Sequence, residues 1–177
     1  MEPRPLLDGA QIAALIERLA SEVAAAFPRP DTLALVGLPT RGVTLAQRLA
    51  ARIGELTGTA LPPVGQIDIT FHRDDLAQHL PIPHETAIPF DTTGKTLLLV
   101  DDVLFTGRTT RAALAALTDF GRPAAIRLLA LVDRGHRQLP IQADYVGTRC
   151  ETALGDRVTV HLTENDGHDT VTLQPAP

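Results

Sequence analysis

The spacing of apolar residues predicts that helices and strands alternate through the first three quarters of the chain. Apolar side chains three and four residues apart indicate helices in these segments: 12–27, 43–53 and 109–120. Short apolar or alternating runs predict strands here: 32–36, 64–71, 97–100 and 125–132. Strands that alternate with helices in this way are typical of an α/β fold built on a doubly wound parallel sheet.

After residue 133 the helical spacing stops. Short strands are predicted in the remaining segments: 145–146, 157–162 and 170–173. Because Glu164–Gly167 has the composition of a turn, we expect a small C-terminal β hairpin over about residues 157–174. No repeat or linker interrupts the sequence, which predicts a single domain over residues 1–177.

The composition narrows the classes of function. Apolar residues make up 44% of the chain, and the net charge of −5 argues against non-specific coating of nucleic acid, although it is compatible with a local basic patch. The absence of Trp weakens any platform for base stacking. The lone Cys150 allows no internal disulfide. With no leader pattern and no membrane-spanning apolar run, we expect a cytoplasmic protein with no membrane partner.

One stretch carries most of the candidate chemistry. The apolar run Leu97–Val100 leads into Asp101 and Asp102, and a short turn with Thr106–Gly107 precedes a helix that starts near Thr109. Two carboxylates can accept hydrogen bonds from vicinal hydroxyls, while turn N–H groups and a helix N-terminus favour a phosphate. The plainer interpretation is a strand end with a helix cap. No P-loop or G-x-G-x-x-G motif is present.

This stretch resembles the phosphoribosyl pyrophosphate motif of type I phosphoribosyltransferases. The resemblance implies the fold of that family, with Asp101 and Asp102 as catalytic residues on the ribose hydroxyls and the turn on the 5′-phosphate, near Thr110. It also implies Mg²⁺ held mainly by the oxygens of phosphoribosyl pyrophosphate. The implied substrate-binding run comprises Asp101, Asp102, Val103, Leu104, Phe105, Thr106, Gly107, Arg108 and Thr109.

Two further segments are candidates for the pyrophosphate. Leu38–Gly42 could be an ordinary strand-to-helix connection, but the resemblance assigns it to pyrophosphate, with Thr40 and Arg41 in the site. Residues 72–91 are polar and lack a sustained period, which predicts a long loop of the functional or mobile kind. In phosphoribosyltransferases a loop here closes over the reacting centre, and Arg73 would then neutralise the departing pyrophosphate; the alternative is a hydrated loop stem.

Three blocks resemble the PyrR family, pyrimidine operon attenuators that are also uracil phosphoribosyltransferases. They are Val64–Leu76, the Phe105 form of the ribose motif, and Leu131–Ile141, within a likeness that covers about residues 10–147. The resemblance implies conversion of uracil and phosphoribosyl pyrophosphate to UMP and pyrophosphate. It places Arg134 and Val158 near the base and nucleotide, and it implies UMP- or UTP-sensitive binding of leader mRNA and assembly into dimers or tetramers.

The basic surface that PyrR proteins use for RNA is reduced in this sequence. A basic residue usual at Gln142 is missing, and residues 147–153 lack the usual Gly-Lys-Asn-x-Pro-Thr-Ser run. Arg18, Arg137 and Arg149 remain as candidate RNA-binding residues. Three alternatives stay open: an attenuator with little enzyme activity, an enzyme that has lost RNA binding, and a phosphoribosyltransferase for another base.

Overall fold

The computed structural model describes residues 2–69 and 85–176. The elements of the first half are β1 (Arg4–Asp8), α1 (Gly9–Ala26), the 3₁₀ turn η1 (Pro30–Thr32), β2 (Leu33–Gly37), α2 (Arg41–Thr57) and β3 (Val64–Gln66). Those of the second half are β4 (Thr96–Leu104), α3 (Arg108–Leu117), η3 (Thr118–Phe120), β5 (Ala125–Asp133), β6 (Tyr145–Arg149), β7 (Arg157–His161), α4 (Thr163–Asp166) and β8 (Thr170–Gln174).

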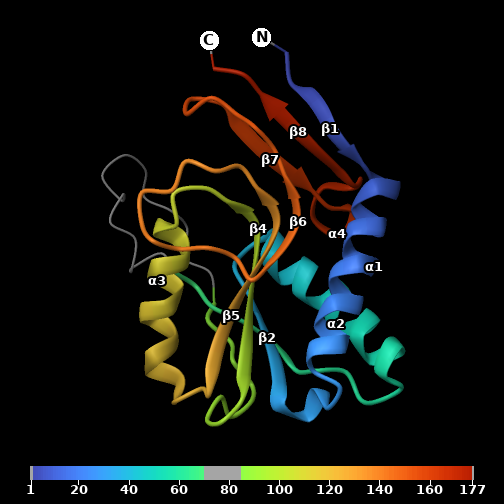
Figure 1. Cartoon of the computed structure of the whole chain (residues 1–177), viewed down its shortest axis with the longest axis vertical. Helices are drawn as coiled ribbons and strands as arrows, with labels where there is room; N and C mark the ends of the chain where they lie inside the picture. The colour runs from blue at the N-terminus through green and yellow to red at the C-terminus, as the bar shows by residue number, and fades with distance from the viewer. Residues whose placement is uncertain (1, 70–84, 177) are drawn as a thin grey trace.

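The main sheet confirms the doubly wound α/β prediction. Within the described residues it has five parallel strands in the order β3-β2-β4-β5-β6. Figure 1 shows α1 and α2 on one face and α3 on the other. Successive residues of β4 alternate between the two cores, so that Leu98 and Val100 pack with α1 and α2, whereas Leu97 and Leu99 pack with α3. A strand buried on both faces explains the continuous apolar run in the sequence.

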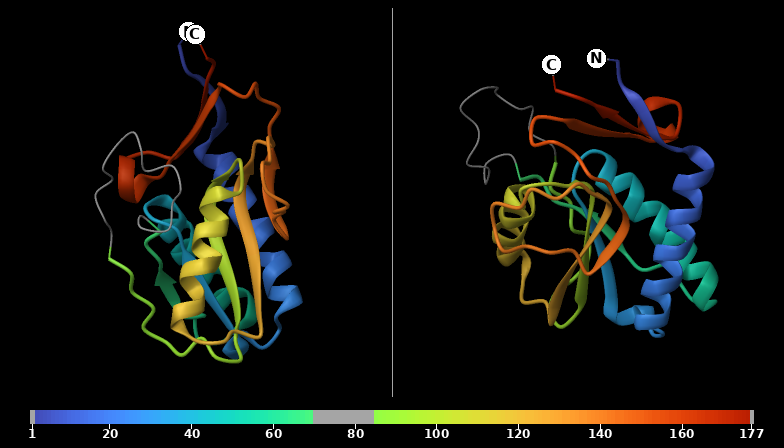
Figure 2. Two further views of the ribbon diagram at one scale, coloured as in Figure 1. Left: turned by 90° about the vertical axis from the view of Figure 1, so that its left-hand side faces the viewer. Right: turned by 45° about the horizontal axis from the view of Figure 1, so that its top comes forward.

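A second, antiparallel sheet lies across the carboxyl ends of the main strands (Figures 1 and 2). In the described part of the chain its order is β1-β8-β7, so the predicted hairpin is present as β7 and β8. The short helix α4, which ends at Gly167 with φ 82°, replaces the turn expected at 164–167. The sequence did not predict β1, because a five-residue strand containing Pro5 has no clear period and its partner, β8, lies at the other end of the chain.

Two other boundaries differ from the predictions. β3 ends at Gln66, although Ile67 and Ile69 are buried, and Gln66 then bridges to Ala87 beyond the segment that the structure leaves undescribed. Most of the predicted loop at 72–91, including Arg73, lies outside the described residues. β4 extends through both acids, because β5 continues alongside it as far as the pair Leu104 and Asp133. No helix among the described residues is long and apolar enough to cross a membrane.

Candidate functional site

The candidate site begins where β2 ends beside β4. Gly37 is in register with Val100, the residue before the paired acids, and the N–H of Leu38 donates to the Val100 carbonyl at 3.0 Å. A Cβ on Gly42 would lie 2.5 Å from the same carbonyl oxygen, so only glycine lets the first turn of α2 approach this closely. The N-terminus of α2 therefore lies against the start of the acidic pair.

The two acids differ in exposure. Asp101 is 6% exposed, and its Oδ1 accepts the N–H of Asp102 at 2.9 Å. Asp102 is half-buried, and its Oδ1 accepts the N–H of Val103 at 3.0 Å. These local bonds hold both side chains at the carboxyl edge of the sheet, where ligands bind in open α/β folds.

The turn after the acids forms a cavity of about 190 Å³. Gly107 adopts φ 89°, a left-handed conformation that favours glycine, and α3 starts immediately after it. The cavity is lined by residues Asp101, Val103, Leu104, Phe105, Thr106, Gly107, Arg108, Thr109 and Thr110. Among the described residues, the Thr110 Oγ1 is the buried side-chain oxygen that has no hydrogen-bond partner. An unpartnered hydroxyl beside a helix N-terminus suits an anionic ligand.

A neighbouring segment, residues 135–141, braces this turn from the outside. The N–H groups of Gln138 and Leu139 donate to the Thr106 carbonyl at 3.0 and 3.3 Å. Arg137 donates to the Phe105 carbonyl at 2.6 Å and the Ile141 carbonyl at 3.0 Å, and it pairs with the buried Asp133 at 2.6 Å. Arg137 therefore ties the end of β5 to the start of the phosphate turn.

Arg134 contacts both Phe105 and the segment that leads into β7. The Arg134 guanidinium lies 4.0 Å from the centre of the Phe105 ring, and it donates to the Asp156 carbonyl at 2.6 Å and the Ala153 carbonyl at 2.9 Å. Burial lowers the pKa of Arg134 from its ordinary value. Val158, two residues after Asp156, packs in the same apolar cluster as Val103. Because Phe105 lines the same cavity as Asp101, Arg134 lies beside the turn that follows the predicted ribose residues.

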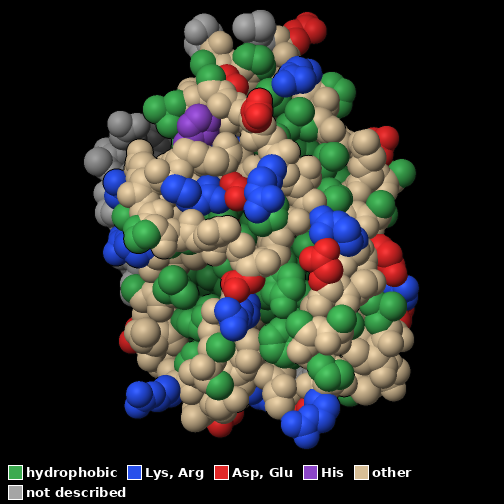
Figure 3. Space-filling view, in the orientation of Figure 1, with side chains coloured by type: hydrophobic (Ala, Val, Ile, Leu, Met, Phe, Trp, Pro, Cys, Tyr) green, Lys and Arg blue, Asp and Glu red, His purple; other side chains and the backbone are tan. Residues whose placement is uncertain are grey.

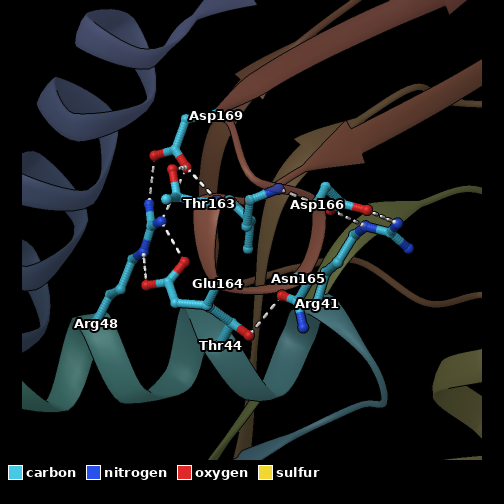
Figure 4. Close-up of polar contacts among 9 residues, drawn as sticks. Arg41, Thr44, Arg48, Thr163, Glu164, Asn165, Asp166 and Asp169 are labelled. Atoms are coloured by element: carbon cyan, nitrogen blue, oxygen red, sulfur yellow. Dashed lines mark hydrogen bonds and ion pairs between the residues drawn. The ribbon is translucent and has the colours of Figure 1, made fainter.

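Arg41 has a partner that the sequence did not predict. Its Nε and Nη2 donate to Asp166 of α4 at 3.1 and 2.6 Å (Figure 4). The hydrogen bonds to Asp166 raise the pKa of Arg41, and the charge of Asp102 raises it further. The same arginine lowers the pKa of Asp166 to about 2. In the sequence, Asp166 stood in a segment interpreted only as a turn, and its acidity alone gave no sign of a partner 125 positions away.

Comparison with known proteins identifies the family. Residues 5–163 match the family model described as phosphoribosyl transferase domain. The bifunctional protein PyrR of Streptomyces coelicolor is 51% identical over 178 residues, which cover 99% of this chain and 92% of that protein. The bifunctional protein PyrR of Elusimicrobium minutum is 51% identical over 168 residues, covering 94% of this chain and 93% of that protein. This chain belongs to the PyrR family of phosphoribosyltransferases.

Solved structures agree with this family at the level of the fold. A hypoxanthine phosphoribosyltransferase from Staphylococcus aureus superimposes with a TM-score of 0.70 at 16% identity, covering 98% of this chain and 92% of that one. A hypoxanthine-guanine phosphoribosyltransferase from Bacillus anthracis gives 0.71 at 15% identity, covering 99% and 100%. The PyrR-family chain therefore has the type I phosphoribosyltransferase fold.

The three arginines predicted to bind RNA in this PyrR-family chain lie in different surroundings. Arg18 donates to the carbonyls of Val146 and Gly147 at 3.0 and 2.6 Å, which ties α1 to β6. Arg137 is engaged with the phosphate turn, as described above. Arg149 is exposed and lines an open cleft of about 680 Å³ beside residues 134–137. Figure 3 shows basic side chains with an acidic one between them on the face of Figure 1.

The donor set is compatible with a Mg²⁺ ion bound mainly through substrate. No group of three or more His, Cys, Asp or Glu side chains among the described residues could hold a metal ion. Asp101 and Asp102, adjacent at the end of β4, offer the one or two carboxylates that Mg²⁺ uses when phosphates supply most of its ligands. The PyrR-family site thus fits a metal that arrives with a polyphosphate.

Proposed function

We propose that this chain is a uracil phosphoribosyltransferase that also regulates a pyrimidine operon through its mRNA. One observation carries the enzymatic part: Asp101, the first of the two adjacent acids in β4, lines a cavity together with the glycine turn and Thr110, whose hydroxyl has no partner among the described residues. Carboxylates can accept hydrogen bonds from the two ribose hydroxyls, and the nearby N–H and O–H groups can donate to a phosphate. The arrangement therefore matches ribose 5-phosphate. Membership of the PyrR family narrows the base to uracil.

In the proposed reaction, uracil loses its N1 proton and N1 forms a bond to the anomeric carbon, as the bond from that carbon to pyrophosphate breaks. Asp101 and Asp102 hold the ribose hydroxyls, and residues Thr106–Thr109 hold the 5′-phosphate. Thr40 and Arg41 receive the pyrophosphate, while Arg134 and Val158 border the base. Asp101 and Asp102 would hold Mg²⁺ together with the oxygens of phosphoribosyl pyrophosphate, and the ion would supply charge neutralisation on the leaving group. Catalysis follows from positioning and from electrostatic stabilisation of departing pyrophosphate.

Arg73 and the rest of residues 72–84 lie outside the described residues. The proposal gives Arg73 the role of neutralising pyrophosphate when a loop covers the centre, since exclusion of water protects an oxocarbenium-like transition state. We also propose that the chain acts in the cytoplasm and assembles into dimers or tetramers. Light scattering coupled to size exclusion measures that assembly directly.

The enzymatic proposal is tested by incubating the protein with uracil, phosphoribosyl pyrophosphate and Mg²⁺ and measuring UMP and pyrophosphate. Hypoxanthine, guanine and orotate serve as competing bases. We expect UMP in stoichiometric balance with pyrophosphate and a clear preference for uracil. A folded protein that forms no UMP would refute the proposal, and a preference for another base would change its substrate.

The regulatory part is tested by a gel shift with the leader RNA of the pyrimidine operon, with and without UMP. We expect UMP to strengthen binding, because the segment 135–141, part of which lines the cleft that contains Arg149, also donates hydrogen bonds to Thr106 of the nucleotide cavity. If RNA affinity were the same with and without UMP, or if no RNA bound, the regulatory role would be refuted and only the enzymatic role would remain.

A further inference from the structure

The connection between β7 and β8 contacts one face of α2 over two helical turns. Glu164, Asn165 and Asp166 lie on α4 and meet residues spaced three and four apart on α2 (Figure 4). Asn165 Oδ1 accepts the Thr44 hydroxyl at 2.7 Å, and Glu164 accepts Arg48 Nε at 2.8 Å. Asp169 adds a second carboxylate on Arg48 at 2.6 Å. The contact nearest the candidate site is the pair of Asp166 with Arg41.

We propose that Asp166 is a positioning residue that holds Arg41 ready for the pyrophosphate group. The inference rests on the proposed function, which assigns Arg41 to pyrophosphate. Asp166 itself touches no substrate in this proposal. It acts through the orientation of the Arg41 guanidinium.

The geometry of the pair leaves one side of the guanidinium available. A guanidinium carries five N–H donors, and Asp166 uses those on Nε and Nη2. Within the described part of the chain, Nη1 has no hydrogen-bond partner. It therefore presents two N–H groups on the side away from Asp166. Phosphate oxygens are good acceptors for such donors.

Holding the arginine in advance strengthens the binding of an anion. A long side chain that is loose in the free protein loses rotamer entropy when its ligand arrives. The Arg41 side chain is 30% exposed and that of Asp166 is 17% exposed, so the pair is partly protected from solvent. Asp166 is in turn held by the Leu162 N–H at 2.9 Å. The rotamer entropy of Arg41 is therefore lost when the protein folds and not when the anion binds.

The experiment compares Asp166→Asn with Asp169→Asn as a matched control. Both changes remove one carboxylate from the same connection, but Asp169 pairs with Arg48, about two helical turns along α2 from Arg41. Pyrophosphate and ribose 5-phosphate are titrated separately with Mg²⁺ present, and KM for phosphoribosyl pyrophosphate and for uracil is measured. We expect Asp166→Asn to raise the Kd of pyrophosphate and the KM of phosphoribosyl pyrophosphate about tenfold, since one charge-assisted contact is lost.

Ribose 5-phosphate affinity and the KM of uracil should stay unchanged in both variants, and Asp169→Asn should leave pyrophosphate binding unchanged. Asp166→Glu keeps the charge and is expected to retain most of the pyrophosphate affinity. An equal loss of pyrophosphate affinity in Asp169→Asn or in Asp166→Glu would overturn the inference. Tighter pyrophosphate binding by Asp166→Asn would also overturn it, because Asp166 would then compete with pyrophosphate for Arg41. If the unaltered protein bound no pyrophosphate, the assignment of Arg41 in the proposed function would fail instead.

Discussion

At the level of single residues, the Thr110 hydroxyl distinguishes a ligand-binding role from a structural one. It is buried and has no partner in the free protein, where a buried unsatisfied group costs stability. Thr110→Val keeps the shape and removes the hydroxyl. We expect the free energy of unfolding to stay equal or rise by about 1 kcal/mol, while the affinity for ribose 5-phosphate falls about tenfold. Thermal unfolding and calorimetric titration measure the two effects.

Thr44→Val is the control for this substitution. The Thr44 side chain is also buried, but its hydroxyl donates to Asn165 at 2.7 Å. Its removal should lower the free energy of unfolding by about 1 kcal/mol and leave ribose 5-phosphate binding alone. If Thr110→Val destabilised the protein as Thr44→Val does and bound the sugar phosphate normally, Thr110 would have no role in the cavity.

Arg137 was predicted as an RNA-binding residue, but its donors point into the protein. Arg137→Lys replaces a planar fork by a single ammonium, which leaves the carbonyls of Phe105 and Ile141 with fewer donors. We expect a loss of about 2 kcal/mol in the free energy of unfolding and weaker ribose 5-phosphate binding, because the turn loses its brace. Chemical denaturation and calorimetry measure both quantities.

Arg127→Lys provides the comparison for Arg137→Lys. Arg127 also forms an ion pair, with Asp144, but its side chain is 52% exposed. Exposed pairs of this kind contribute little, so the change should stay within about 0.5 kcal/mol and should not affect sugar phosphate binding. A loss as small for Arg137→Lys would mean that the phosphate turn needs no brace.

At the level of elements, the length of each helix or strand and the spacing of its apolar residues decided whether the sequence could predict it. Helix α2 was predicted over 43–53 and spans Arg41–Thr57, since its apolar stripe is long enough to set its own period. The extra strand β1 and the helix α4 escaped prediction, because each has five residues or fewer and depends on distant partners. Tertiary pairing, more than local preference, forms such short elements.

The contact of α4 with α2 predicts an acid-sensitive element. Hydrogen bonds from Arg41 hold the pKa of Asp166 at about 2, against 3.8 ordinarily. A carboxyl whose pKa is lower in the folded state adds stability above its unfolded pKa and loses it as the pH falls through the folded value. The contribution should therefore be complete above about pH 4 and vanish towards pH 2. Thermal midpoints of the unaltered protein and Asp166→Asn, measured across this range, should converge as the pH falls.

The lowered pKa values of Glu164 and Asp169 act in the same direction, with Arg48 as the cause of each. Both carboxyls remain in Asp166→Asn, so that variant should still lose some stability in acid. A constant difference between the two proteins from pH 4 to pH 2 would show that pairing with Arg41 does not lower the pKa of Asp166. Amide exchange at residues 163–166 would locate the change.

At the level of the whole molecule, the sequence predicted the sheet edge at which the candidate site is placed, but not all of the contacts made there. Asp101–Thr109 is contiguous, so its strand, acids, turn and helix appear in order in the sequence and lie together in the structure. Asp166 reaches Arg41 only because a second sheet folds over the first, and no local pattern encodes that contact. The hydrogen bonds of Arg18 and Arg137 to the backbone have the same origin, since their acceptors are carbonyls far away in the sequence.

These hydrogen bonds lead to a prediction about RNA binding by the whole protein. Arg18 and Arg137 both donate to carbonyls of the chain and the net charge is −5, so we expect few cations to replace counterions on RNA. In a plot of log affinity against log salt, we expect a slope of about −1 to −2 for the leader RNA with UMP, and Arg149→Gln should reduce its magnitude by about 0.7. Filter binding from low to high salt measures both slopes. A slope steeper than about −4 would mean that several other basic residues contact the phosphates, and the exposed cleft around Arg149 would then be a minor part of the RNA surface.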